Sequence, residues 1–518
     1  MVRTLGAARF DGLSISSGRA DVPAGDDLRA GAILAAGRLD IERCIFSDNF
    51  AAQGPAAISA PRSLVLKDSS FTSNVAGTWG SGAVEVGGTS ADSTTLDNVV
   101  FEKNVAQGAL FATVNVGTPT TVRNCTFSRN TGDQNGAAAL YVLRTTASIT
   151  GTTFDSNTGP AVTNDSSEVE IADSTIKAGS AGVVNTFLPT KTTIRNVTFY
   201  GIAGIPVFGQ GNGSVGGPNY CSLDIKGSRF LLNQRGAVST YDCELSVSDT
   251  LFESNTGADQ GGAIQHSTTS GIELAIERTI FKANVATADG GSIYYANAPA
   301  RIVASTFESN SAGANGGAIA GRYPISLRLD SCRMFDNRAA MNGGVVSLDN
   351  ANVTLENSLA YGNSAQGGAV IYRGSGAGLL VIVNSTLSLN RASSAQSGAI
   401  DAHGTKSIQN SILWGDSPSE VPAGTTLPNT PDSLLVDFSD IQGSSASTIQ
   451  ADPKFADPAS FDFHLSAGSP CIDAADDSIA PPMDLDGHPR RSAAGAAGCA
   501  PDAAVCVNAD VGAFEFGG

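Results

Sequence analysis

The feature that most constrains this chain is a phrase of about fifteen residues that recurs along it. It reads TLFESNTGADQGGAI from Thr250 to Ile264 and STFESNSAGANGGAI from Ser305 to Ile319, with a looser copy, TIFKANVATADGGSI, from Thr279 to Ile293. Self-similarity at a fixed period is the sequence signature of repeat architectures. We therefore expect each copy to be one structural unit that stacks on the next.

Aligning the copies on the Phe of F-x-x-N gives columns that keep their phase along the chain. Aliphatic residues stand five and seven positions before the aligned residue, which is the period-2 pattern of a strand with one buried face. Asn, Asp or Gly usually stands three positions before it and predicts a corner in the left-handed region. The aligned residues are Phe46, Phe71, Phe101, Phe127, Phe154, Ile176, Phe199, Phe230, Phe252, Phe281, Phe307, Met334, Ala360, Leu387 and Leu413.

An asparagine column follows three residues after the aligned position. Identical amides at successive turns of a parallel solenoid would bond to one another as a ladder. The period-2 pattern and the Gly-Gly pairs disfavour a helical solenoid, and a β-propeller would need about 40 residues per blade. The sequence therefore predicts an all-β parallel β-helix of about 16 coils, each of about 26 residues. The column contains Asn49, Asn74, Asn104, Asn130, Asn157, Asn233, Asn255, Asn284, Asn310, Asn337, Asn363 and Asn390.

Composition narrows the class of protein further. The 518 residues carry a formal net charge of -18, which disfavours nucleic acid as a partner because a polyanion would be repelled. No apolar stretch is long enough to predict a membrane-spanning helix. The N-terminus lacks a signal-peptide core and starts inside a repeat, so we expect the chain to be a fragment, or an incomplete start, of a larger protein.

The coils over about residues 10 to 445 resemble the repeats of polymorphic outer-membrane proteins and, more broadly, the pectate-lyase-like right-handed parallel β-helix superfamily. The tail resembles the choice-of-anchor Q module of secreted bacterial β-helix proteins. The resemblance implies two parts, a β-helix over residues 1–445 and a small C-terminal capping module over 446–518, in a secreted or cell-surface protein. The matching tail motifs are D-P-x-F-x-D-P from Asp452, F-H-L from Phe463, S-P-x-I-D from Ser469, D-x-D-G from Asp484 and D-x-G-A-x-E from Asp510.

The eight cysteines are sorted by the columns. Cys221 and Cys243 stand at the same position one coil apart, within disulfide range, although two stacked thiols fit this placement too. Cys499 and Cys506 bracket a loop rich in Gly, Ala and Pro, where an exported setting would permit a bridge.

Motifs for catalysis and metal binding are sparse. HExxH, GxSxG, P-loop and CxxC patterns are absent from the sequence. Asp484 and Asp486 in DLDG resemble the start of a calcium-binding loop, but a simple turn explains them as well. Calcium is therefore the one cofactor that the sequence suggests.

In pectate-lyase-like enzymes the substrate lies along one strand face, where acidic residues and an Arg or Lys base act. The matching face here follows Gly-Gly, and its outward residues would form a stripe of Arg322, Asp349, Arg373, Asp401 and His403. A solvated row of alternating charges is the plainer interpretation. Two functions stay open: a structural, adhesive or carbohydrate-binding scaffold that takes a polysaccharide or cell-surface glycan, or a polysaccharide lyase or glycoside hydrolase.

Overall fold

The computed structural model describes residues 2–517 except 22–29, 108–111, 133–137, 187, 212–220, 375–377, 396, 422–432, 445–447 and 491–508. The chain divides into two compact units, Met1–Ser246 and Val247–Gly518. Within the described residues, every element is a β-strand apart from one 3-10 helix, η1 (Pro458–Ser460). The all-β prediction is therefore confirmed.

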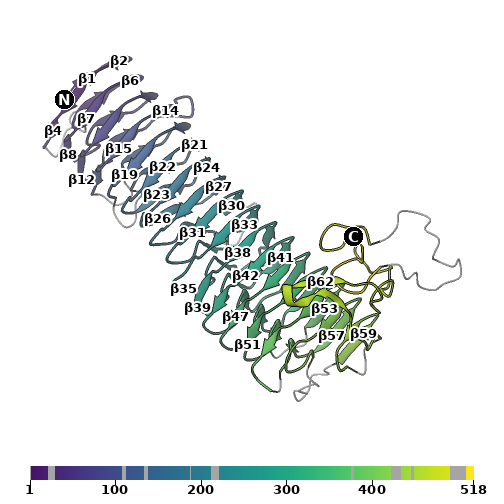
Figure 1. Ribbon diagram of the computed structural model, residues 1–518. Coiled ribbons are helices and arrows are strands. Elements are labelled where there is room, and N and C mark those ends of the chain that lie inside the picture. Colours follow the sequence, from purple (N-terminus) through teal and green to yellow (C-terminus); the bar gives the residue numbers. More distant parts are fainter. Residues whose placement is uncertain are drawn as a thin grey trace. The chain divides into compact units, whose positions relative to one another are not determined.

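Each unit contains a parallel β-helix, whose strands pair with their counterparts one turn away (Figure 1). One turn of the N-terminal unit runs through β9 (Ile58–Ala60), β10 (Leu64–Lys67), β11 (Ser70–Thr72) and β12 (Val75–Trp79). The next turn begins at β13 (Val84–Val86), where Val84 pairs with Ile58. We call the sheets that contain β9, β10 and β11 sheets A, B and C, and use the same names for the corresponding sheets of the C-terminal unit.

The number of turns differs slightly from the expectation. The alignment missed a first turn, because Ile15 and Gly18 stand there in place of Phe and Asn. Its strands β1 (Val2–Thr4), β2 (Ala8–Asp11) and β3 (Ser14–Ser16) pair with β5 (Ile33–Ala35), β6 (Leu39–Glu42) and β7 (Ile45–Ser47).

The aligned phenylalanines form the centre of the core, as predicted. Phe281 and Phe307 are fully buried, and their rings stack with centroids 4.9 Å apart. The left-handed corner predicted three positions before the aligned residue is also confirmed, because Asn357, Asn384 and Asn410 have φ of 50°, 45° and 49°. Burying each Phe side chain contributes about 1.5–3 kcal/mol, so the column is a main source of stability.

The asparagine ladder is confirmed in both units. The backbone N–H of Asn310 and its Nδ2 both donate to Oδ1 of Asn337, at 3.0 and 2.9 Å, and Nδ2 also donates to the carbonyl of Phe281 at 2.9 Å. Each fully buried amide thus accepts two bonds from one neighbouring turn and donates to its other neighbour. In the C-terminal unit the same pattern runs from Asn255 to Asn390.

The last rung of this ladder is a carboxyl group. Asp416 takes the place of Asn, and its Oδ1 accepts from the backbone N–H and the Nδ2 of Asn390, at 2.6 and 2.9 Å. Its own N–H donates to Glu420 at 3.0 Å, and both carboxyl groups are buried. Burial raises both pKa values, and the neighbouring Asp416 raises that of Glu420 further. Two buried carboxyls in contact cannot both ionise readily, so the pair retains a proton.

The tail docks along the side of the C-terminal unit. It touches the last turn, where Ile449 pairs with Asp440, and then forms the hairpin β61 (Phe455–Asp457) and β62 (Asp462–Leu465). We expected a cap on the end of the β-helix, but most of the described tail covers the outer face of sheet C. The covered strands are β46 (Arg333–Phe335), β50 (Leu359–Tyr361), β54 (Thr386–Ser388) and β58 (Ile412–Trp414).

The outward residues of sheet C explain this docking. One position after the aligned residue, earlier turns of this unit carry Glu253, Lys282 and Glu308. Three of the four covered turns carry an aromatic residue at this position, Phe335, Tyr361 and Trp414, and the fourth carries Ser388. Tyr361 and Trp414 pack against buried apolar residues of the tail. The change from charged to aromatic side chains leaves an apolar surface that must be covered.

Replacing Asn310 with Ala tests the ladder. The change removes the acceptor for two donors of Asn284. It also removes one of the two donors to Asn337, because the backbone N–H of residue 310 remains while the Nδ2 group is lost. We expect the free energy of unfolding to fall by about 1–3 kcal/mol, measured by urea denaturation. Gln366→Ala, which removes an exposed amide from the same unit, is the control and should change little. Equal losses in both variants would contradict the ladder's role.

The carboxyl pair predicts a pH dependence of stability. Because both folded pKa values are raised, the stability they contribute is complete at low pH and is lost as the pH rises above the usual carboxyl range of about 4. Glu420→Gln removes one of the two charges and should flatten this decline in urea unfolding between about pH 4 and 7. The exposed Glu273→Gln should leave the decline unchanged. Identical pH profiles for wild type and Glu420→Gln would show that the pair does not titrate as proposed.

Candidate functional site

The predicted stripe does not form as expected, because Arg373 points inward. Its strand β52 (Ile371–Arg373) pairs with β48 (Val346–Leu348) so that Arg373 lies opposite Leu348, and the side chain is 1% exposed. The coil has one residue more between Gly-Gly and the strand, since Val346 pairs with Ile371 rather than with Val370. A shift of one residue moves a side chain to the other face of the sheet. Arg373 is therefore corrected from a surface residue to a core residue.

The other stripe residues remain at least partly exposed at the surface. Arg322 is exposed over the ring of Tyr323 at 5.2 Å, and Asp349 is exposed one turn further on. Asp401 is half-buried and accepts a bond from Ser397 at 3.0 Å, and His403 is also half-buried. With Arg373 inside, Arg322 is the one arginine of the stripe that remains at the surface.

The DLDG carboxylates are both bound to protein partners. Asp484 is buried and accepts backbone N–H bonds from Asp486 at 2.9 Å, His488 at 2.7 Å and Glu515 at 3.0 Å. Burial raises its pKa, but these bonds outweigh burial and lower it overall. Asp486 pairs with Arg333 and contacts His464 Nε2 at 2.8 Å. In the part of the chain that the structure describes, no three His, Cys, Asp or Glu side chains gather to hold a metal.

The structure joins Cys221 and Cys243 in a disulfide with Cα atoms 4.7 Å apart, one of the two arrangements left open by the sequence. Cys499 and Cys506 lie outside the described residues.

A large cleft that the sequence analysis missed lies over sheet A of the N-terminal unit. Its floor carries the outward residues of β13, β17 (Val114–Val116) and β20 (Leu140–Leu143), in which Glu85 pairs with Asn115 and Asn115 with Tyr141. The cleft has a volume of about 1150 Å³, and we call it the sheet A cleft. The sequence did contain a signal for this cleft. The middle residue of each short apolar strand, such as Glu85 or Asn115, faces outward, but these coils lack the Gly-Gly motif that guided the alignment. Further lining residues are Val86, Thr89, Pro119, Leu143, Arg144, Thr145, Asp165 and Leu188.

The cleft combines fixed polar groups with apolar walls. The Tyr141 hydroxyl donates to the Asp165 carboxylate, and Ser166 Oγ donates to the other Asp165 oxygen at 2.9 Å. Burial, and then the Asp165 carboxylate, raise the pKa of Tyr141 above its usual value, so the phenol stays protonated. Leu143 and Arg144 at the end of β20 add an apolar and a cationic group to the lining. Such a mixture suits a ligand that has hydroxyls and apolar faces.

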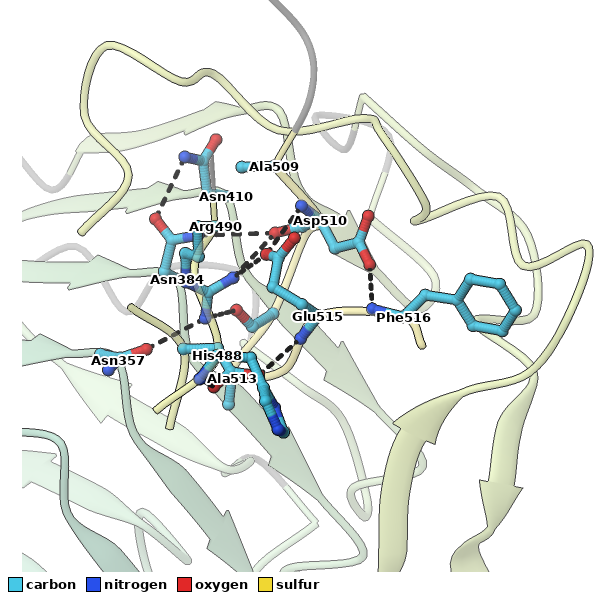
Figure 2. Close-up of polar contacts among 12 residues, drawn as sticks. Asn357, Asn384, Asn410, His488, Arg490, Ala509, Asp510, Ala513, Glu515 and Phe516 are labelled. Atoms are coloured by element: carbon cyan, nitrogen blue, oxygen red, sulfur yellow. Dashed lines mark hydrogen bonds and ion pairs between the residues drawn. The ribbon is translucent and has the colours of Figure 1, made fainter. Parts of the chain in front are cut away.

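The D-x-G-A-x-E motif of the tail surrounds one buried side chain, Arg490 (Figure 2). Its Nη1 donates to Glu515 at 2.7 Å and to the carbonyl of Asp510 at 3.2 Å, while Nη2 donates to Asn357 at 3.0 Å and to the carbonyl of Gly512 at 2.9 Å. One guanidinium therefore ties the D-x-G-A-x-E segment to a corner of the β-helix. Burial, and then Asp510, raise the pKa of Glu515 to about 7, although Arg490 opposes this shift.

The corner residue Asn410 also forms hydrogen bonds with the tail. Asn410 Nδ2 donates to the carbonyl of Asp476 at 2.9 Å, and its Oδ1 accepts from the Asp476 N–H at 2.8 Å. The N–H of Gly512 donates to the carbonyl of Asn410 at 2.8 Å. The motif residues thus act in docking the tail.

Within the described residues, no helix has the length and hydropathy needed to cross a bilayer.

Arg490→Met should loosen the docked tail. The change leaves Glu515 buried beside Asp510 without its cation, so we expect a loss of about 3–5 kcal/mol in the free energy of unfolding. The amides of Gly512 and Ala513, which bond to Asn410 and Thr386, should exchange with solvent faster by hydrogen–deuterium exchange. Arg391→Met removes an exposed arginine from the same unit and serves as the control. Unchanged exchange in Arg490→Met would exclude this docking role.

Comparison with known proteins agrees with this architecture. Residues 108–275 match the family model for a right-handed beta helix region, and residues 304–322 match the Chlamydia polymorphic membrane protein repeat. The chain is also similar to the metabotropic glutamate receptor-like protein R of Dictyostelium discoideum, with 25% identity over 357 residues, 64% of this chain and 20% of that protein. The chain thus spans about a fifth of that relative's length. These matches support a right-handed β-helix with repeats like those of polymorphic membrane proteins, which is consistent with a surface or exported protein.

Proposed function

We propose that this chain is an exported or cell-surface β-helix scaffold that binds an extended, neutral glycan in the sheet A cleft. The observation that carries the proposal is the cleft itself, about 1150 Å³ in volume and lined by both apolar and hydrogen-bonding side chains. Successive turns lie about 4.8 Å apart, a spacing close to one sugar unit of an extended chain. A glycan that runs across the turns would therefore contact the side chains of a new turn with each of its sugar units.

The charges of the cleft favour a neutral ligand. Glu85 and Asp165 face one lining cation, Arg144, and the chain as a whole has a net charge of -18. Both facts disfavour acidic polysaccharides. The Cys221–Cys243 disulfide supports export, because disulfides persist mainly in oxidising compartments. The pectate-lyase-like and choice-of-anchor relationships, and an adhesive role, remain predictions.

The double variant Glu85→Gln, Arg144→Ala tests the cleft. A glycan array of neutral and acidic polysaccharides would identify a ligand, and isothermal titration would measure its Kd. We expect the variant to raise the Kd at least tenfold, a change of about 1.4 kcal/mol, because the Arg144 guanidinium is lost and Glu85 loses the charge that strengthens its bonds to sugar hydroxyls.

Arg123→Ala is the matched control, because it removes an exposed arginine of sheet B that pairs with Asp97 at 3.0 Å in the same unit. Its Kd should equal that of wild type. Failure to bind any glycan, or equal weakening in the control, would overturn the proposal. New reducing ends that disappear in the double variant would instead assign a hydrolase.

A further inference from the structure

A second cleft lies in the C-terminal unit, where the hairpin β61–β62 meets sheet C. It has a volume of about 340 Å³, at the lower end of the range of about 300–1,000 Å³ for small-molecule sites. We call it the tail cleft. Its lining includes Arg333 and Tyr361 from β46 and β50, and Phe461, His464 and Asp486 from the tail.

A stack of aromatic rings leads from the β-helix into the tail at this cleft. Phe335 and Tyr361 stack with centroids 5.1 Å apart, and Tyr361 and Phe461 with centroids 5.0 Å apart. Phe461 ends the stack and is 50% exposed. A further ring could stack on its open side, as sugar and aromatic rings do on exposed aromatic faces.

The backbone of Phe461 adopts the left-handed conformation, which this fold also uses at bulky residues such as Tyr323 and Leu389. Its φ of 63° lies in the left-handed region, which is unfavourable for a bulky residue and is more often occupied by Gly or Asn. The ring of Phe461 packs on Tyr361 and is still half exposed. A ligand that stacks on the ring explains why a Phe stands there.

Polar groups beside the ring are held in place by one network. His464 Nδ1 lies 2.6 Å from Asp462 and its Nε2 lies 2.8 Å from Asp486, which also pairs with Arg333. Burial lowers the pKa of His464, but the two carboxylates outweigh it and raise the pKa overall. Among the described residues, both bonds to Asp462 use Oδ1, and this side chain is 45% exposed. Asp462 and Arg333 can therefore meet hydroxyl groups at the rim.

We propose that the tail cleft binds one neutral pyranose, with the ring stacked on Phe461 and hydroxyls bonded to Asp462 and Arg333. The volume limits the ligand to about one or two sugar units. The positive charges of His464 and Arg333 are balanced by Asp462 and Asp486, so a neutral sugar fits better than a charged one. The site shares no residue with the sheet A cleft and does not depend on the function proposed there.

The test uses the full chain and a panel of methyl glycosides of glucose, galactose, mannose and N-acetylglucosamine, titrated at millimolar concentrations with NMR detection. We expect at least one of them to bind weakly, as small ligands do. Phe461→Asn should raise its Kd at least tenfold, because the ring is lost while Asn tolerates the left-handed backbone. Asp462→Asn should weaken binding as well.

Tyr323→Asn is the matched control. Tyr323 is also an aromatic residue with positive φ, 51°, in the same unit, and it is 68% exposed. The control should bind as wild type does, and hydrogen exchange at Ala513 should show that the tail stays docked in every variant. The proposal is overturned if no glycoside binds, if Phe461→Asn binds like wild type, or if binding is lost only in the sheet A cleft variant.

Discussion

The fold depends on the fixed register between neighbouring turns, and the buried asparagine ladder secures that register. In each rung, one Oδ1 accepts both the backbone N–H and the Nδ2 of the preceding rung, as between Asn310 and Asn337. A turn that slipped by one residue would leave all these buried groups without partners, at a cost of about 1–3 kcal/mol each. The phenylalanine stack lies a few residues away and is therefore held in phase by the same bonds.

Features that repeat at every turn could be predicted from the sequence. The Phe column, the asparagine ladder and the left-handed corner each rest on a local requirement that recurs, such as the conformation at Asn384. The orientation of Arg373 could not be predicted, because it depends on one additional residue between Gly367 and Ile371. An alignment on the Gly-Gly motif does not detect such a difference in the length of a corner. The sheet A cleft was missed for a related reason, since Glu85 and Asn115 belong to coils in which the guiding motif is absent.

The position of the tail shows how a repeat protein acquires a local surface. Solvent-facing residues are free to vary from turn to turn, whereas the inward columns are not. In the C-terminal unit this freedom produced Tyr361 and Trp414 on sheet C, and the tail covers both. Arg490 then joins the tail to Asn357, a residue whose first role is to form a corner. Docking thus reuses groups that the β-helix already presents.

The carboxyl group of Asp416 ends the ladder. An asparagine both accepts and donates, so a turn duplicated anywhere between Asn255 and Asn390 would find the same partners on each side. The Asp416 carboxyl group accepts bonds from Asn390 but has no side-chain N–H to donate to a further rung, and its backbone N–H donates to Glu420 instead. Evolution can therefore lengthen this protein by inserting whole turns ahead of those that the tail covers, while the C-terminal boundary of the ladder stays unchanged.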